Sequence, residues 1–214
     1  MEYVDIFDDA LKYLGKVPKK EAHQTGAWHK SIHCWIVRKD DAGNQYVVFQ
    51  KRSASKKAFP NFLDISAAGH YQAGEHIEDG VREIIEELGI KVAFEDLKYL
   101  GIKFDIYKDT TIFNREFCET FLYQDNRPLK EYPIDCVEVT GLVQIQLQDG
   151  LDLFSKKVDS VFATGVEYSE KTKQVEEISI SINRDLFINR TDPYYGKIFM
   201  IARAYFSGEQ QLFI

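Results

Sequence analysis

The chain has 214 residues, of which 44% are hydrophobic and 29% are charged, a balance that suits one globular domain with a proper core. Its formal net charge of -7 argues against general nucleic-acid binding, which requires a basic surface. The three cysteines form no CxxC pair, so the sequence indicates neither a disulfide framework nor a zinc knuckle.

Residues 1–20 predict a short strand or helix that leads to a turn at Pro18. They are acidic and contain no long apolar run, and no segment of the chain reaches the length of a membrane span. We therefore expect a cytoplasmic protein with no signal peptide and no membrane partner.

Two strands are predicted next, at residues 32–38 and 46–50, because DDAGN between them is rich in turn-forming residues. His23, His29 and His33 lie just before and within the first strand, in a chain with five histidines. A single histidine is more often a core or surface residue than a ligand. Three within eleven residues make metal ligation a serious alternative.

A basic loop, RSASKKAFP, follows at residues 52–60. Its cations, Arg52, Lys56 and Lys57, have two interpretations that composition alone does not separate. They bind phosphate groups beside a metal site, or they are simply solvated on a surface loop.

Segment 69–90, GHYQAGEHIEDGVREIIEELGI, predicts an amphipathic helix in its second half. Four apolar residues recur at helical spacing: Val81, Ile84, Ile85 and Leu88. Three glutamates share the i, i+3, i+4 spacing on another face: Glu83, Glu86 and Glu87. A solvated acidic face is the simpler interpretation. Carboxylates that converge on one point, however, repel one another unless a cation neutralises them, and they suit Mg²⁺ or Mn²⁺. Gly89 predicts the end of the helix.

Two more strands are predicted at residues 97–107 and 117–124. Glu116 and Glu119 lie at the start of the second strand, where an acid completes a metal shell, acts as a base or forms an edge-strand salt bridge. A strand at 142–147 and a short helix at 148–154 come next.

The last part of the chain predicts a hairpin and a helix. Residues 160–167 and 174–182 pair around YSEKTK, and VEEISISI alternates as a strand does. Asp192 and Pro193 resemble an N-cap followed by proline at the first helical position, and Gly208 marks the end. The inward face of this helix is expected to be apolar: Tyr195, Ile198, Phe199, Ala202 and Phe206. These elements shape a substrate pocket or form a dimer surface.

The segment at 69–90 resembles the Nudix box. The matching residues are Gly69, Glu75, Arg82, Glu83, Ile84, Glu86, Glu87, Gly89 and Ile90. One spacing differs, because six residues rather than the usual seven separate Glu75 from Arg82, which puts the bracing role of Glu75 in doubt. The resemblance implies an α+β Nudix fold, an α/β/α sandwich with a mixed central β-sheet. We expect a single Nudix domain over 1–214, with its core at 20–155 and a C-terminal hairpin and helix addition at 156–214.

The resemblance also implies a metal-dependent hydrolase that cleaves the diphosphate linkage of a small molecule, with Mg²⁺ or Mn²⁺ as cofactor. The expected metal ligands are Glu83, Glu86, Glu87 and the Gly69 carbonyl, and the expected catalytic acids are Glu83, Glu86 and Glu116. Arg82 would orient carboxylates rather than touch the substrate. A homodimer is a family-level expectation, and nucleic acid is not an expected partner.

Residues 20–155 further resemble the isopentenyl diphosphate isomerases, a branch of the Nudix fold. That likeness implies that Arg52 and Lys56 bind diphosphate. It also implies a second metal site at His23, His29, His70 and Glu116. Ala68 replaces the catalytic cysteine of the isomerases, and Asn114 replaces a glutamate. Because a methyl group cannot transfer a proton, we expect a hydrolase. The alternatives are an isomerase-like activity, which Cys118 leaves open, and a catalytically silent nucleotide-binding sensor.

Overall fold

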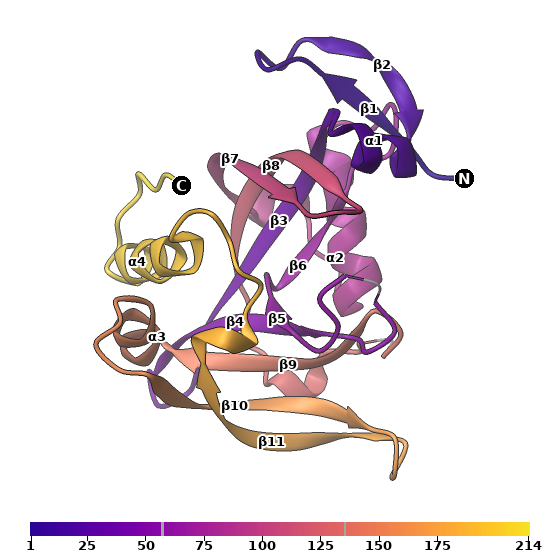
Figure 1. Ribbon diagram of the computed structural model, residues 1–214. Coiled ribbons are helices and arrows are strands. Elements are labelled where there is room, and N and C mark those ends of the chain that lie inside the picture. The colour runs from indigo at the N-terminus through magenta and orange to yellow at the C-terminus, as the bar shows by residue number, and fades with distance from the viewer. Residues whose placement is uncertain (57, 135) are drawn as a thin grey trace.

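The computed structural model describes residues 1–56, 58–134 and 136–214, and its helices cover both faces of a large sheet (Figure 1). The strands are β1 Tyr3–Phe7, β2 Tyr13–Pro18, β3 Trp28–Lys39, β4 Gln45–Arg52, β5 Leu63–Asp64, β6 Ala67–His70, β7 Lys98–Lys108, β8 Phe113–Gln124, β9 Val139–Gln146, β10 Ser160–Ser169 and β11 Gln174–Asn183. The α-helices are α1 Lys19–Thr25, α2 Val81–Leu88, α3 Leu147–Phe154 and α4 Tyr194–Phe206. Short 3-10 turns are Ile77–Gly80, Phe94–Asp96, Leu129–Glu131 and Arg184–Leu186.

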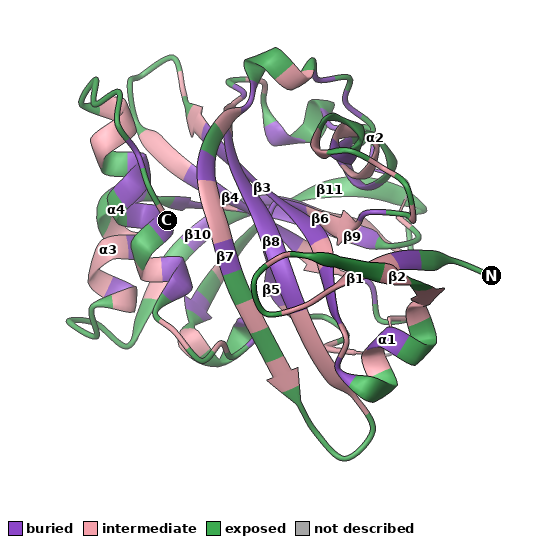
Figure 2. Cartoon of the chain, turned by 90° about the horizontal axis from the view of Figure 1, so that it is seen from above, coloured by how far each residue is buried: buried purple, intermediate pink, exposed green. Residues whose placement is uncertain are grey.

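The sheet is mixed, as predicted. β3 is parallel to β8, while its pairings with β1, β4 and β6 are antiparallel. One path through the sheet runs β11-β10-β9-β4-β3-β1-β2, and β7 pairs with β8 beyond it. Because β3 has neighbours along most of its length, it is buried from Ser31 to Val37, and Figure 2 shows buried residues concentrated along β3, β4 and β8.

Two hydrophobic clusters lie on opposite faces of the sheet. Alternate β3 side chains point to opposite faces, so Trp35 packs with α3 and α4, whereas Ile36 packs with α2. The buried apolar residues of α2, Ile84 and Leu88, come from its predicted apolar stripe. The α/β/α sandwich is therefore confirmed. None of the helices in the described residues is long and apolar enough to cross a membrane.

The N-terminal prediction was incomplete. Residues 1–20 contain a hairpin, β1–β2, and α1 begins at Lys19 immediately after Pro18 instead of a turn. Gly26 ends α1 in the left-handed conformation at φ 71°, with its N–H donated to the Ala22 carbonyl. Pro18 before this helix and Gly26 after it are a recognisable helix signal.

The predicted cap of α4 was wrong. The helix begins at Tyr194 with Pro193 as its N-cap, and no side chain caps it. The Asp192 carboxylate instead accepts a hydrogen bond from Lys197 Nζ at 3.0 Å. This ion pair draws the carboxylate away from the helix N-terminus. The C-terminal hairpin β10–β11 was predicted correctly.

Candidate active site

Strand register brings the candidate residues onto one face of the sheet. His29 on β3 lies opposite Glu116 on β8, and Ser31 lies opposite His70 on β6. Side chains of directly opposite residues project to the same face, so three strands that are distant in sequence contribute to one surface. α1 then brings His23 beside His29, with the two ring centroids 5.0 Å apart.

A cavity of about 260 Å³ opens over this face. Its walls include His23, His33, His70 and Glu116 from the sheet side, and Arg52 and Phe59 from the basic loop. Asn189 and Arg190, which precede α4, complete the wall. The cavity thus joins the histidines, the basic loop and the C-terminal addition.

The second predicted metal set is assembled in this cavity. One ligating atom from each of His23, His29, His70 and Glu116 lies within 4.8 Å of those of the others. His23 Nε2 is 3.3 Å from His29 Nε2, and His70 Nε2 is 3.3 Å from Glu116 Oε1. Nitrogen and carboxylate donors at this spacing suit a transition metal or Mn²⁺.

The protonation of these side chains also fits a cation. Burial, assisted by repulsion from the other two histidines, lowers the pKa of His23 to about 4. Burial likewise lowers the pKa of His29, whose Nδ1 lies 2.9 Å from the Ala27 carbonyl and leaves Nε2 facing the cluster. Although burial acts to raise it, the pKa of Glu116 is held well below its usual value by His70 and His29. The unprotonated imidazoles of His23 and His29, beside the Glu116 carboxylate, are ready to bind a metal.

Glu83 of the box packs directly on β6. A β-carbon built at Gly69 would lie 2.0 Å from Cδ of Glu83, so only glycine permits this contact. Burial raises the pKa of Glu83, even though Arg82 Nη1 donates to its carboxylate at 2.9 Å. The Gly69 backbone and the Glu83 carboxylate are therefore neighbours, as the metal-ligand prediction requires.

Glu87 is the most deeply buried acid of the box, with 4% of its surface exposed. Its Oε2 accepts from the Ala68 N–H at 2.8 Å and from Gln50 Nε2 at 3.1 Å. Burial raises the pKa of Glu87 to about 8, so the folded chain would be stabilised by further positive charge at this carboxylate. A hard divalent cation fits this donor set.

Arg82 organises the exposed side of the box. It donates to Glu75 at 3.0 and 3.1 Å and, at 2.9 Å, to Glu86. Glu75 therefore braces the helix through Arg82 despite the shortened spacing. The side chain of Glu86 is 56% exposed, in contrast to buried Glu87.

The three box carboxylates do not converge on one point here. Among the described residues, the groups with ligating atoms within 4.8 Å of one another are the histidine cluster and the set His33, Glu116 and Cys118. Helical spacing brought Glu83, Glu86 and Glu87 to adjacent positions on α2. Arg82 then binds the carboxylates of Glu83 and Glu86, whereas Gln50 and the Ala68 N–H bind that of Glu87.

The two acids considered on β8 have different environments. Glu116 faces the cavity, where Asn114 Nδ2 donates a hydrogen bond to it. Glu119 accepts from Lys30 Nζ at 3.1 Å and from the Tyr99 hydroxyl at 2.7 Å. Three residues along a strand reverse the direction of a side chain, which explains why Glu119 lies outside this cavity.

The basic loop is only partly directed to the cavity. Arg52 lines it, although its guanidinium donates to the carbonyls of Ala58 and Phe59 at 3.1 and 3.2 Å. Lys56 pairs with Glu138 at 2.6 Å and is not among the cavity-lining residues. Lys57 lies outside the described residues.

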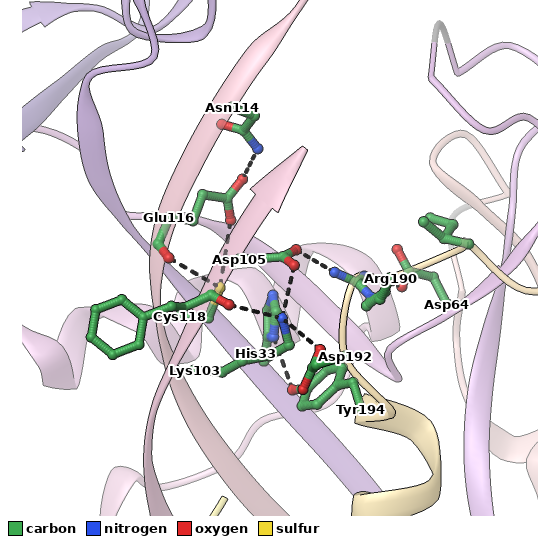
Figure 3. Close-up of polar contacts among 12 residues, drawn as sticks. His33, Asp64, Lys103, Asp105, Asn114, Glu116, Cys118, Arg190, Asp192 and Tyr194 are labelled. Carbon is green, nitrogen blue, oxygen red and sulfur yellow. Dashed lines mark hydrogen bonds and ion pairs between the residues drawn. The ribbon is translucent and has the colours of Figure 1, made fainter. Parts of the chain in front are cut away.

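A charged network in the wall of the cavity was missed by sequence analysis. Arg190 pairs with Asp64 at 2.7 Å and with Asp105, and Lys103 pairs with Asp105 at 2.7 Å (Figure 3). Asp64 lies beside apolar Leu63 in a strand whose two residues are both buried, which was the available signal, whereas the residues on either side of Asp105 in β7 are exposed. No sequence pattern marked Arg190 as part of the network, because this residue lies in an irregular segment.

His33 joins this network to the cavity. Its Nδ1 lies 2.9 Å from the hydroxyl of Tyr194, and burial, with nearby Arg190, lowers the pKa of His33 to about 4. The imidazole is therefore neutral at pH 7. His33 was noted in the sequence only as part of the histidine group.

Comparison with known proteins agrees with this geometry. The family model of the NUDIX domain matches residues 27–144. An uncharacterized Nudix hydrolase of Clostridium acetobutylicum is 36% identical over 194 residues, covering 91% of this chain and 93% of the relative. The chain therefore belongs to the Nudix family. It is a Nudix hydrolase, of the enzyme class that acts on diphosphate bonds.

Two further similarities concern the branch of the Nudix family and the fold of the chain. An isopentenyl-diphosphate Delta-isomerase of Mycolicibacterium vanbaalenii is 28% identical over 127 residues, which cover 56% of this chain and 65% of the isomerase. A crystal structure of a Deinococcus radiodurans protein matches with a TM-score of 0.51 and 19% identity, covering 72% of this chain and 90% of that one. The first supports the isomerase-like resemblance, and the second shows a similar fold.

Proposed function

We propose that the protein is a divalent-metal-dependent hydrolase that cleaves the diphosphate linkage of a small molecule. The observation that carries this proposal is the position of β6. Gly69 contacts the Glu83 carboxylate of the box, while the next residue, His70, belongs to the histidine cluster in the cavity. Two metal-compatible donor sets therefore meet on one short strand. Nudix hydrolases generally use a divalent metal, and these sets fit one.

The residues that would hold the metals follow from the donors. Glu83, Glu86, Glu87 and the Gly69 carbonyl would hold Mg²⁺ or Mn²⁺, and His23, His29, His70 and Glu116 would hold a second ion. Bound divalent metal neutralises phosphate oxygens and acidifies water.

The remaining roles belong to side chains. Arg82 orients the carboxylates of Glu83 and Glu86 by donating to both. Arg52 faces the cavity and would bind a phosphate oxygen, whereas Lys56 would first have to leave Glu138. Glu116 is ionised and faces the cavity, so we assign it as the acceptor of the proton from water, with Glu83 and Glu86 as the box alternatives.

Isomerisation is the second candidate function. The sequence similarity to isomerases is the reason for including it in the test. Ala68 supplies no acid or base. The thiol of Cys118 lies 3.8 Å from Glu116, but it is fully buried, and burial raises its pKa well above the usual value. A neutral thiol that is sealed from the cavity cannot readily replace the missing cysteine.

The test is release of phosphate or monophosphate from a panel of diphosphate compounds with Mg²⁺ or Mn²⁺. We expect turnover that Glu86→Gln/Glu87→Gln lowers roughly 100-fold or more. The control, Glu176→Gln/Glu177→Gln, removes the same charge from exposed positions on β11 and should retain activity. Allylic isomer formed from isopentenyl diphosphate would support isomerisation, and metal-dependent binding without turnover would support the sensor.

We also infer that the chain is one domain, because the cluster that contains Trp35 of the core strands also contains Phe199 of the C-terminal addition. A cytoplasmic location and a homodimer complete the proposal. Size-exclusion chromatography with light scattering tests the dimer, and fractionation of the cells that produce the protein tests the location.

A further inference from the structure

A buried polar chain connects the C-terminal helix with the cavity. Tyr194, the first residue of α4, is 0% exposed. Its hydroxyl oxygen lies 2.8 Å from Trp35 Nε1 and 2.9 Å from His33 Nδ1. Figure 3 shows Tyr194 beneath the imidazole of His33, with Glu116 and Asp105 beyond the opposite edge of the ring. The structure therefore links α4 to a residue that lines the cavity.

The direction of these hydrogen bonds determines the tautomer of His33. The indole N–H of Trp35 can only donate, so the Tyr194 oxygen accepts this hydrogen bond. His33 Nδ1, 2.9 Å away, is then the acceptor that the geometry offers to the Tyr194 proton. A neutral imidazole carries its proton on the other nitrogen when Nδ1 accepts, so His33 becomes an Nε2–H donor.

This donor faces the cavity, and no described residue accepts a hydrogen bond from it. The two ring nitrogens point in nearly opposite directions, so Nε2 is directed away from Tyr194 and towards the wall that His33 contributes to the cavity. No hydrogen bond is formed by Nε2 among the described residues. Ser31, two residues earlier on the same face of β3, also lines the cavity, but its buried hydroxyl interacts with the Glu116 carboxylate and the Cys118 thiol.

We propose that Tyr194 is a positioning residue that holds His33 as an Nε2–H donor, and that His33 donates to an oxygen of the group attached to the substrate diphosphate. The ligand contact rests on the proposed function, whereas the positioning role of Tyr194 does not. An unpaired buried donor disfavours a hydrocarbon ligand, because a ligand without an acceptor leaves the donor unsatisfied. The group beside Glu116 is therefore oxygenated rather than purely hydrocarbon.

The tautomer is measured by NMR of ¹⁵N-histidine-labelled protein with Mg²⁺, using His33→Gln to assign His33 among the five histidines. We expect the Nε2–H pattern in the wild type and a shift towards Nδ1–H or a tautomer mixture in Tyr194→Phe. Tyr205→Phe, on the same helix, should keep the wild-type pattern. An Nδ1–H pattern in the wild type would overturn the assignment, since it requires Tyr194 to donate to neighbouring Thr120 instead. An unchanged pattern in Tyr194→Phe would overturn the positioning role.

The ligand contact is measured as the Kd, with Mg²⁺, of 3-methylbutyl diphosphate and 3-hydroxy-3-methylbutyl diphosphate, in which one hydroxyl group replaces a hydrogen atom. We expect the hydroxylated compound to bind about tenfold more tightly. His33→Asn, whose amide occupies the Nδ1 position, should remove this preference, whereas His33→Gln, whose amide reaches the Nε2 position, should keep most of it. Equal affinities in the wild type, or a preference that survives His33→Asn, would overturn the contact.

Binding of neither compound would also overturn the ligand half. The NMR result is independent of turnover, so loss of the hydrolase proposal and loss of the tautomer assignment remain distinguishable.

Discussion

The α-carbon of Gly69 faces the carboxylate of Glu83 so closely that a β-carbon there would lie 2.0 Å from Glu83 Cδ. This contact fixes the distance between β6 and α2, and through it the relation between the box and the histidine cluster. Glycine is required at this position by space alone, because no left-handed backbone conformation is recorded for it.

Gly69→Ala should therefore displace Glu83 and lower kcat/KM roughly 100-fold, because small misplacements of reacting groups are costly. We expect overpacking to reduce the free energy of unfolding by about 1–3 kcal/mol. Gly196→Ala is the control, since its β-carbon would meet Phe154 Cβ at an ordinary 3.5 Å. Steady-state kinetics and urea denaturation measure both effects, and full activity in Gly69→Ala would contradict the arrangement.

His23→Gln should weaken Mn²⁺ binding at the histidine cluster by at least about tenfold, because it disturbs one of four convergent donors. Isothermal titration calorimetry would show a loss of affinity in one class of sites while the box site remains. His76→Gln, at an exposed position before α2, should bind as the wild type does. Identical isotherms for the wild type and both variants would show that the histidine cluster is not a metal site.

Arg190→Met should destabilise the protein by about 3–5 kcal/mol, because buried Asp64 keeps only the more distant Arg52, at 3.6 Å, and Asp105 loses one of its two cations. The additional change Asp64→Asn should recover part of that loss. Urea denaturation of the single and double variants measures the free energies of unfolding. As a control, Lys157→Met removes an exposed ion pair with Asp152 and should leave stability unchanged. A negligible effect of Arg190→Met would mean that water satisfies both acids.

Asp109 predicts a specific acid dependence of stability. Hydrogen bonds from the backbone N–H groups of Thr111 and Ile112 lower the pKa of Asp109 to about 2 in the turn between β7 and β8. The folded state therefore favours the carboxylate, and its contribution is complete above the unfolded pKa of about 3.9 and disappears as pH falls through about 2.

Urea denaturation between pH 5 and pH 2 should show a smaller acid-dependent loss in Asp109→Asn than in the wild type. Asp41→Asn, in the exposed turn after β3, should follow the wild type. Parallel curves for the wild type and Asp109→Asn would show that the turn does not bind the carboxylate.

The sequence by itself determined the local elements and the family. Apolar spacing located α2 and alternation located the β10–β11 hairpin, because both patterns depend on neighbouring residues. The box motif identified the Nudix resemblance, and motif alignment selected His23, His29, His70 and Glu116 before their proximity was known. α1 was missed, although Pro18 and Gly26 enclose it.

Tertiary structure decided which side chains meet and which are diverted. Spacing along a helix placed Glu83, Glu86 and Glu87 together, but Gln50 of β4 and the Ala68 N–H of β6 draw the Glu87 carboxylate away from the other two. Register between β3, β6 and β8 placed His29, Ser31 and His33 on the cavity face.

The contact between His33 and Tyr194 spans 161 residues of sequence. No local pattern encodes it, because the directions of both side chains depend on how α4 packs against the sheet.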